Sequence, residues 1–346
     1  MKNSIKRVQS ENLFSALSNG RILRVAKTKY LAFAAAAFML ASCSNDEDFV
    51  PQDDLKDTPI TLNVTTSDLI ATRAGYPEGA LTNGALSFYF TTHTSADGEA
   101  WEEPRYNATN EKWYYNESKW CFESTTADTE QIVWAGDCVG KWWAVYPYQA
   151  SLNATTKTLD WTVSTTQTEE TWNKEDLLWA KDDNQTSERV DITFTHALTK
   201  LTVNITGYGT EVAADEQAIS SITIQGSKVA ATVTPATQTW STPTDDAVDD
   251  IAALKMEPPY YIGTSAEQYV ASYDALLIPQ TAVLTIVITL GNGKSYSKTL
   301  NSYEFESGNA YTVTLKIGQD KVEIAEDGIT AKPWGIMEGG ELGTVK

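Results

Sequence analysis

The sequence predicts an all-β protein made of antiparallel β-sandwiches. Short runs that alternate apolar and polar residues recur along the chain, and Gly, Pro, Asn and Asp separate them. This is the pattern of strands joined by tight turns. Ser and Thr are abundant, and no segment shows the period of a long amphipathic helix. Many short strands with frequent turns favour antiparallel sandwiches.

The expected strands follow one another closely. The first covers 60–65, where Ile60, Leu62 and Val64 alternate with polar residues. Gly291-Asn292-Gly293 lies between two alternating runs and indicates a hairpin. Residues 169–180 are expected to form a short helix or a loop. The other expected strands are 86–91, 190–194, 198–205, 222–224, 229–233, 276–278, 282–290, 294–300 and 311–317.

Residues 1–42 have the parts of a signal peptide. Basic residues come first, and 30–40 is an apolar run without charge. The run is shorter than the roughly 20 residues that a spanning helix needs, and small residues follow it. The end of this segment, Leu40-Ala41-Ser42-Cys43, resembles a bacterial lipobox. The resemblance implies cleavage between Ser42 and Cys43 and acyl chains on Cys43. The alternative is a buried core helix after a disordered arm.

Residues 43–58 are interpreted as an acidic tether. The stretch 44–48 is similar to the surface-export signal of lipoproteins in some Gram-negative anaerobes. That similarity implies transport to the outer leaflet of the outer membrane, with membrane contact only through the lipid. A solvated tether explains the same residues and is compatible with export.

The net charge of the chain excludes one class of partner. The leader holds seven of the 26 basic residues and one of the 46 acidic ones, which leaves 19 basic and 45 acidic side chains, a formal charge of −26. Nucleic-acid binding needs Lys and Arg to neutralise phosphates. The charge therefore argues against nucleic acid, and also against electrostatic attachment to anionic lipid.

Two cysteines remain if Cys43 is lipidated. Outside the cytoplasm Cys121 and Cys138 could form a disulfide that closes a loop of about 17 residues and contributes roughly 3 kcal/mol. The alternative is two small buried apolar side chains. Spacing alone does not show whether the Cα atoms come close enough to bond.

The chain divides into two halves of different composition. Nine of the eleven tryptophans lie before 180, whereas Thr, Val and Ile dominate later. The polar stretch 181–187 separates the halves. We therefore expect an aromatic-rich N-terminal sandwich at 59–187 and a C-terminal sandwich at 188–346, with a donor-strand tail considered for its end.

Several motifs in order resemble the fimbrillin family, the pilins and accessory subunits of type V pili. The most specific is 194–201, Phe-Thr-His-Ala-Leu-Thr-Lys-Leu. The likeness extends over nearly the whole chain after Cys43. The other motifs are Thr72-Arg73-Ala74, Ala144-Val145-Tyr146-Pro147-Tyr148, Asp176-Leu177-Leu178-Trp179-Ala180, Ile278-Pro279-Gln280, Gly308-Asn309-Ala310-Tyr311-Thr312-Val313, Ile329 and Trp334-Gly335.

The resemblance implies two tandem transthyretin-like sandwiches and assembly by strand exchange. In the family, a trypsin-like protease cuts after an arginine near the N-terminus, which here matches Arg73, before Ala74. The first strand, 60–70, would leave with the lipid, and a strand of a neighbouring pilus subunit would fill the groove. The matching donor would follow Ile324 and contain Ile329, Trp334 and Ile336. Arg73 could equally be a solvated loop residue.

The position in a fibre stays open. Several glycines after Trp334 weaken the tail as a strand. Tip, anchor and stalk subunits, or an adhesin that keeps its lipid, are all compatible with the family. The fimbriae would lie at the cell outer membrane and serve adhesion to a host or bacterial surface ligand.

A glycan-binding surface lipoprotein is the second hypothesis. Trp113, Trp120 and Trp142-Trp143 could stack on sugar rings, although aromatics in sandwiches are more often core. Exposure of these side chains would distinguish the two. We expect no enzyme, no metal and no cofactor, because there are only two histidines and no phosphate loop or nucleophile motif. His196 is expected to pack or hydrogen-bond where the two halves meet.

Overall fold

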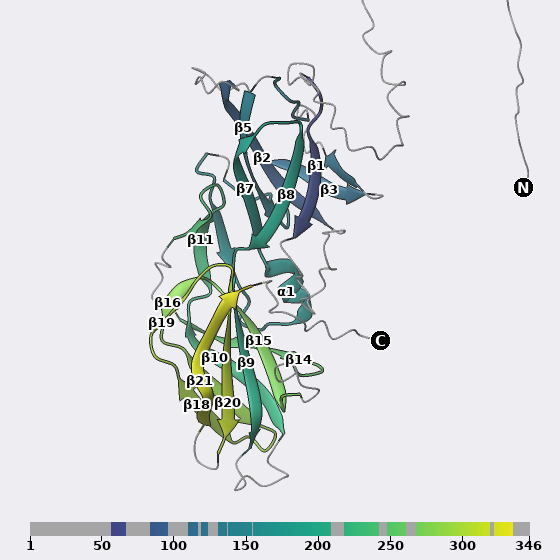
Figure 1. Ribbon diagram of the computed structural model, residues 1–346. Helices are drawn as coiled ribbons and strands as arrows, with labels where there is room; N and C mark the ends of the chain where they lie inside the picture. Colours follow the sequence, from purple (N-terminus) through teal and green to yellow (C-terminus); the bar gives the residue numbers. More distant parts are fainter. Residues whose placement is uncertain are drawn as a thin grey trace, which may run out of the picture. The chain divides into compact units, whose positions relative to one another are not determined.

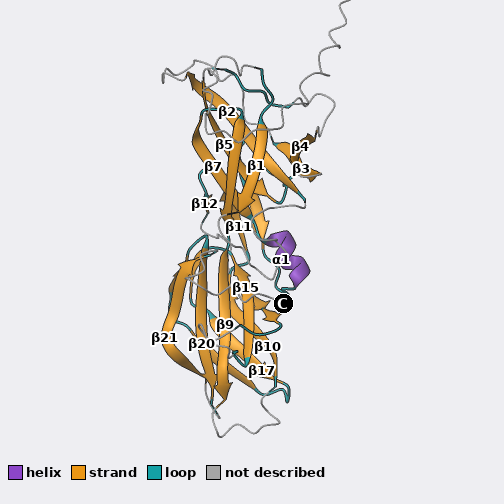
Figure 2. Cartoon of the chain, turned by 45° about the vertical axis from the view of Figure 1, so that its right-hand side comes forward, coloured by secondary structure: helices purple, strands orange, loops and turns teal. Residues whose placement is uncertain are grey.

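Strands make up almost all of the regular structure, as predicted (Figure 1, Figure 2). The computed structural model describes residues 57–66, 84–95, 110–116, 119–123, 131–136, 138–153, 155–208, 218–241, 248–260, 268–318 and 322–334. Within these ranges there is a single α-helix, α1 (Glu169–Glu175). No helix among the described residues has the length and hydropathy that a membrane-spanning helix needs.

The N-terminal half forms a seven-stranded sheet in the order β1-β8-β7-β5-β2-β3-β4. Neighbouring strands are antiparallel except for β1 and β8, which run parallel. One face carries a large apolar core that includes Phe88, Phe90 and Trp113. The strands are β1 (Thr61–Thr66), β2 (Ala85–Ser95), β3 (Glu111–Asn116), β4 (Lys119–Glu123), β5 (Cys138–Tyr146), β7 (Leu178–Gln185) and β8 (Arg189–His196).

The C-terminal half is built around a five-stranded sheet, β14-β15-β9-β20-β21, and a four-stranded sheet, β13-β10-β17-β18. Their inward side chains form a second core. These strands are β9 (Thr199–Tyr208), β10 (Ile219–Ser227), β13 (Asp249–Ala252), β14 (Leu254–Met256), β15 (Ala271–Leu277), β17 (Thr285–Leu290), β18 (Ser295–Thr299), β20 (Asn309–Ile317) and β21 (Val322–Pro333). A small sheet pairs β16 (Gln280–Ala282) with β19 (Tyr303–Phe305).

The two halves share a three-stranded sheet in the order β12-β11-β6. Here β6 (Leu159–Thr162) pairs with β11 (Ala230–Thr234), and β12 (Thr239–Trp240) completes the sheet. The pairing of β6 with β11 thus joins residues on the two sides of the predicted domain boundary at 187/188. All described residues belong to one compact unit, 50–346.

The predicted boundary between 187 and 188 lies between β7 and β8, two paired strands of the seven-stranded sheet. Residues 189–196 therefore belong with the N-terminal strands, because β8 pairs with β1 and β7. If the chain is divided according to the sheet that each strand joins, the boundary falls after His196, the last residue of β8. The division into two domains itself stays a prediction.

The motif at 194–201 is where the chain passes between the sheets. Between the end of β8 and the start of β9 lie Ala197 and Leu198, both fully buried. The carbonyl oxygen of Ala197 accepts bonds from Trp240 Nε1 at 2.8 Å and Ser307 Oγ at 2.7 Å. Gly308 has φ of +72°, and a Cβ there would lie 3.2 Å from the carbonyl oxygen of His196. Polar groups from distant segments thus satisfy a buried turn.

The helix expected within 169–180 covers only the first part of that range. Thr168 caps it, because its hydroxyl accepts the N–H of Thr171 at 3.2 Å. Trp172 points inward and donates its indole N–H to Gln167 at 3.0 Å. The remaining residues lead into β7. The hairpin predicted at 291–293 joins β17 and β18.

A close contact between a glycine and an aromatic ring in the N-terminal core yields a stability prediction. A Cβ on Gly140 would lie 2.5 Å from Cζ of Phe90, so Gly140→Ala forces the ring or the strand to move. We expect a loss of about 1–3 kcal/mol in the free energy of unfolding, measured by chemical denaturation. Gly291→Ala is the matched control, because its Cβ would meet Ala218 at an ordinary 3.4 Å. Equal effects of the two substitutions would contradict the packing argument.

Candidate functional site

The edge strand β1 is the feature of this fold that is suited to exchange. It lies at one end of the seven-stranded sheet and pairs in parallel with β8, with Leu62 opposite Val190 and Val64 opposite Ile192. The pairing begins where the N–H of Thr61 donates to the carbonyl of Glu188 at 2.9 Å. A strand from elsewhere could form the same ladder, because main-chain hydrogen bonds carry no sequence information.

The alternation predicted for this strand is confirmed by burial. Ile60, Leu62 and Val64 are 0%, 8% and 6% exposed and belong to the N-terminal core. Burying an aliphatic side chain of this size contributes roughly 1.5–3 kcal/mol. The strand therefore holds its place chiefly through three apolar side chains, and its removal would leave an apolar groove beside β8.

The residues just before β1 are held from the other side as well. Asp57 N–H donates to the carbonyl of Trp134 at 2.8 Å, and Trp134 N–H donates to Thr58 at 2.7 Å. The N–H of Ile60 donates to the carbonyl of Ile132 at 3.1 Å. We call residues 131–134 the rail. Together β8 and the rail grip the entry of the strand on both edges.

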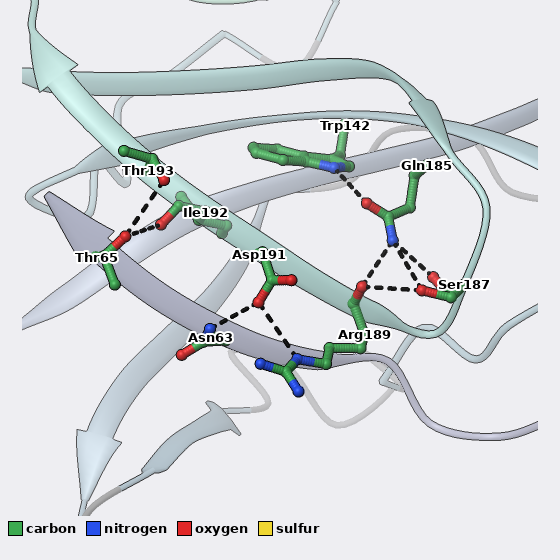
Figure 3. A network of polar contacts seen from close by, with 9 residues as sticks. All are labelled: Asn63, Thr65, Trp142, Gln185, Ser187, Arg189, Asp191, Ile192 and Thr193. Atoms are coloured by element: carbon green, nitrogen blue, oxygen red, sulfur yellow. Dashed lines mark hydrogen bonds and ion pairs between the residues drawn. The ribbon is translucent and has the colours of Figure 1, made fainter. Parts of the chain in front are cut away.

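The outward side of β1 carries a weaker polar network (Figure 3). Asn63 Nδ2 donates to Asp191 Oδ1 at 2.6 Å, and Arg189 Nε donates to the same oxygen at 3.3 Å. Thr65 Oγ1 donates to the carbonyl of Ile192 at 3.3 Å. These groups are largely exposed, so each contact contributes little to stability. In any strand that takes the place of β1, Asp191 favours a hydrogen-bond donor at the position that Asn63 occupies.

A buried amide fixes the start of β8. Gln185 Oε1 accepts the indole N–H of Trp142 at 3.1 Å, while its Nε2 donates to the carbonyls of Ser187 at 2.9 Å and Arg189 at 2.7 Å (Figure 3). The turn between β7 and β8 is therefore tied to the core. This fixes the position at which Glu188 meets β1.

Glu111 is a site residue that the sequence reasoning missed. Its carboxylate is 1% exposed and accepts N–H groups from Trp113 at 3.1 Å and from Ile132, in the rail, at 3.1 Å. Burial raises the pKa of Glu111 to about 7, and the two hydrogen bonds only partly offset that rise. A signal was present, because Glu111 occupies the same alternating positions as the buried Trp113.

Two of the three tail residues predicted for a donor strand, Ile329 and Trp334, contact other parts of the same chain. Ile329 on β21 pairs with Val313 on β20. Trp334 is 8% exposed and its ring stacks on His196, with centroids 3.5 Å apart and planes 3° apart. His196 Nδ1 lies 2.8 Å from Asp176 Oδ1, and both residues are buried. The expectation that His196 packs and hydrogen-bonds between the two halves is confirmed.

The structure does not pair the two cysteines. Cys121 on β4 faces Tyr114, whereas Cys138 on β5 faces Ser95. Strands β2 and β3 lie between β4 and β5. With strands about 4.8 Å apart, the Cα atoms are farther apart than the roughly 7 Å that a disulfide allows.

The tryptophans considered for glycan binding are core residues. Trp113, Trp120, Trp142 and Trp143 are all less than 10% exposed, so they offer no stacking platform. Cys43, Ser42, Arg73, Ala74 and Ile336 lie outside the described residues. Among the described residues, no group of three or more His, Cys, Asp or Glu side chains is placed to hold a metal ion.

Comparisons with known proteins point to one family. Residues 72–334 match the model of a family described as fimbrillin-like. A solved structure of a candidate cell adhesion protein from Bacteroides ovatus is 16% identical, with a TM-score of 0.60 over 81% of this chain and 99% of that one. Another, from Bacteroides uniformis, is 20% identical, with a TM-score of 0.56 over 80% and 98%. At these identities the likeness concerns the fold. A comparison with curated proteins finds no match.

Neighbouring residues of β1 should differ sharply in their contribution to stability. Leu62→Ala removes a buried side chain and should cost about 2–4 kcal/mol. Asn63→Ala removes only an exposed hydrogen bond and should cost less than about 1 kcal/mol. Denaturant unfolding measures both, and limited proteolysis at β1 should accelerate only for Leu62→Ala. A larger effect of Asn63→Ala would mean that the polar face holds the strand.

Proposed function

This chain belongs to the fimbrillin-like family, and we propose that it is a pilus subunit that accepts a strand of another subunit in the place of β1. The observation that carries the proposal is the position of β1 as an edge strand with three buried side chains. Family membership supports a structural, adhesive role at the cell surface rather than an enzymatic one. We interpret the two halves as tandem transthyretin-like sandwiches.

The proposed maturation begins with export as a lipoprotein. Signal cleavage before Cys43 would give a lipid anchor in the outer membrane, as the lipobox resemblance implies. Arg73 lies between the end of β1 at Thr66 and the start of β2 at Ala85. A cut after Arg73 would separate β1 from the rest of the chain and detach the lipid with it. The groove beside β8 would then be free to bind a donor strand.

The groove makes this chain an acceptor in any fibre position. Acting as a donor would require β21 to leave β20 and Trp334 to leave His196, unless residues 335–346 alone serve. The proposal of strand acceptance is the same for a stalk, tip or anchor subunit. The glycan hypothesis is not pursued, because its tryptophans are buried.

Controlled proteolysis tests the maturation step. Trypsin treatment of the purified chain should cut after Arg73 and convert monomers to oligomers that resist boiling in detergent, because exchanged strands dissociate very slowly. Arg73→Ala should stay monomeric under the same treatment. N-terminal sequencing should find Ala74 at the new terminus. If Arg73→Ala forms oligomers equally well, cleavage at this position is not the trigger.

A covalent clamp tests whether β1 itself must leave. Asn63 and Asp191 are directly paired, so the double substitution Asn63→Cys and Asp191→Cys places two thiols within disulfide range. Oxidation should block oligomer formation even after cleavage, and a reductant should restore it. Asn63→Cys alone is the control, and it should assemble like the unmodified chain. Assembly of the oxidised double variant would exclude exchange at β1.

A further inference from the structure

Glu111 is unusual because its buried carboxylate has no positive partner among the described residues. It lies on β3 opposite Phe88, and both of its recorded contacts are N–H groups, the indole of Trp113 and the main chain of Ile132. An isolated buried charge is costly, so such a group needs a structural reason.

A chain of hydrogen bonds links this carboxylate to the entry of β1. The main-chain N–H of Ile132 donates to Glu111. The main-chain carbonyl of Ile132 accepts the N–H of Ile60 at 3.1 Å. The neighbouring Gln131 donates from Nε2 to the carbonyl of Ile60 at 2.8 Å. Both main-chain groups of Ile60 are therefore bound to the rail. Hydrogen bonds connected in this way strengthen one another.

We propose that Glu111 is a positioning residue for strand exchange, whose buried carboxylate holds the rail against β1 and gains water when β1 leaves. This inference rests on the proposed function, because it concerns how readily the β1 position opens. The rail bonds to the residues just before β1, and Glu111 bonds to the rail through the N–H of Ile132. Departure of Ile60 would leave Ile132 without its partner and let water reach the carboxylate.

The electrostatic consequence has a definite sign. With β1 in place, burial raises the pKa of Glu111 from 4.5 to about 7. With β1 gone and the carboxyl hydrated, its pKa returns toward 4.5. We call the protein with β1 in place the closed form and the protein with β1 detached the open form. Between pH 4.5 and about 7, the carboxyl of Glu111 keeps its proton in the closed form and loses it in the open form. The closed form is thus favoured at low pH, and its advantage falls as pH rises to about 7 and is constant above it.

Other charged groups nearby are accounted for within the described residues. On the adjoining strands Lys112 and Glu123 form an ion pair at 2.8 Å, Lys119 begins β4, and Asp57 precedes β1. Phe88 on β2, which pairs with Glu111, carries no charge, and neither does Ile60, which is bonded to the rail. Burial raises the pKa of Glu111, and the two N–H bonds lower it in part. Glu123 therefore serves as a control for a nearby acid that is not buried.

Hydrogen–deuterium exchange of the full chain tests the inference without requiring assembly. Exchange of the 57–66 amides, corrected for the intrinsic effect of pH, reports the opening of β1. From about pH 5 to pH 8 the opening constant should rise by up to roughly 70-fold, the limit set by the two pKa values. Glu111→Gln should remove most of this dependence, and Glu123→Gln should retain it. Amides of β9 serve as the folding check for each variant.

The outcomes separate this inference from the proposed function. A flat profile in the unmodified chain, or an unchanged profile in Glu111→Gln, overturns the role of Glu111 even if fibres form. A pH-dependent opening that disappears in Glu111→Gln supports the role even if trypsin yields no oligomers, in which case self-assembly by strand exchange fails instead. The profile of the unmodified chain keeps the test decisive should Glu111→Gln fail to fold.

Discussion

The parallel contact between β1 and β8 is the constraint on which the N-terminal half depends. Its partners are 128 residues apart at Asn63 and Asp191, so it joins segments that are distant in the sequence. Parallel neighbours cannot be joined by a short turn. The first strand therefore lies at the end of the sheet beside a strand that is late in the same half, and its buried side chains belong to the N-terminal core.

The same strand, β8, connects this edge to the rest of the molecule. It continues through Ala197 and Leu198 into β9, which also has a parallel partner, β20. Each half thus places its first strand parallel to a strand late in the same half. The shared sheet of β6 and β11 and the stack of Trp334 on His196 add further links. The partner strand of β1 is therefore joined to β9 of the C-terminal half by only two residues, Ala197 and Leu198.

Much of the strand pattern was predictable because local alternation decides which face of a strand is buried. Ile60, Leu62 and Val64 illustrate this, and their burial follows the predicted period. Sequence could not show that β8 joins β1, since pairing depends on the whole sheet. Nor could it show that the ammonium of Lys200 lies 2.8 Å from the buried Asp274.

Glu111 and the tail mark the limits of the site prediction. A glutamate in an alternating run can face water or the core, and only the contact with Ile132 shows its relation to β1. The tail was considered as a donor strand because the resemblance to the fimbrillin family implied it. In the structure β21 is a strand of its own sheet, and Trp334 closes over His196. Availability of a segment is a property of packing, which composition does not report.

Under the proposed function, these features give a physical reason for cleavage as the trigger of strand exchange. While 67–84 connects β1 to β2, the strand is present beside its groove at an effective concentration of roughly millimolar or more. A donor from another chain competes poorly against such a tether. A cut in this segment leaves β1 bound only by its three buried side chains and its hydrogen bonds. The cleaved β1 segment then competes as a separate peptide for the groove beside β8, and a donor strand that buries more apolar surface displaces it.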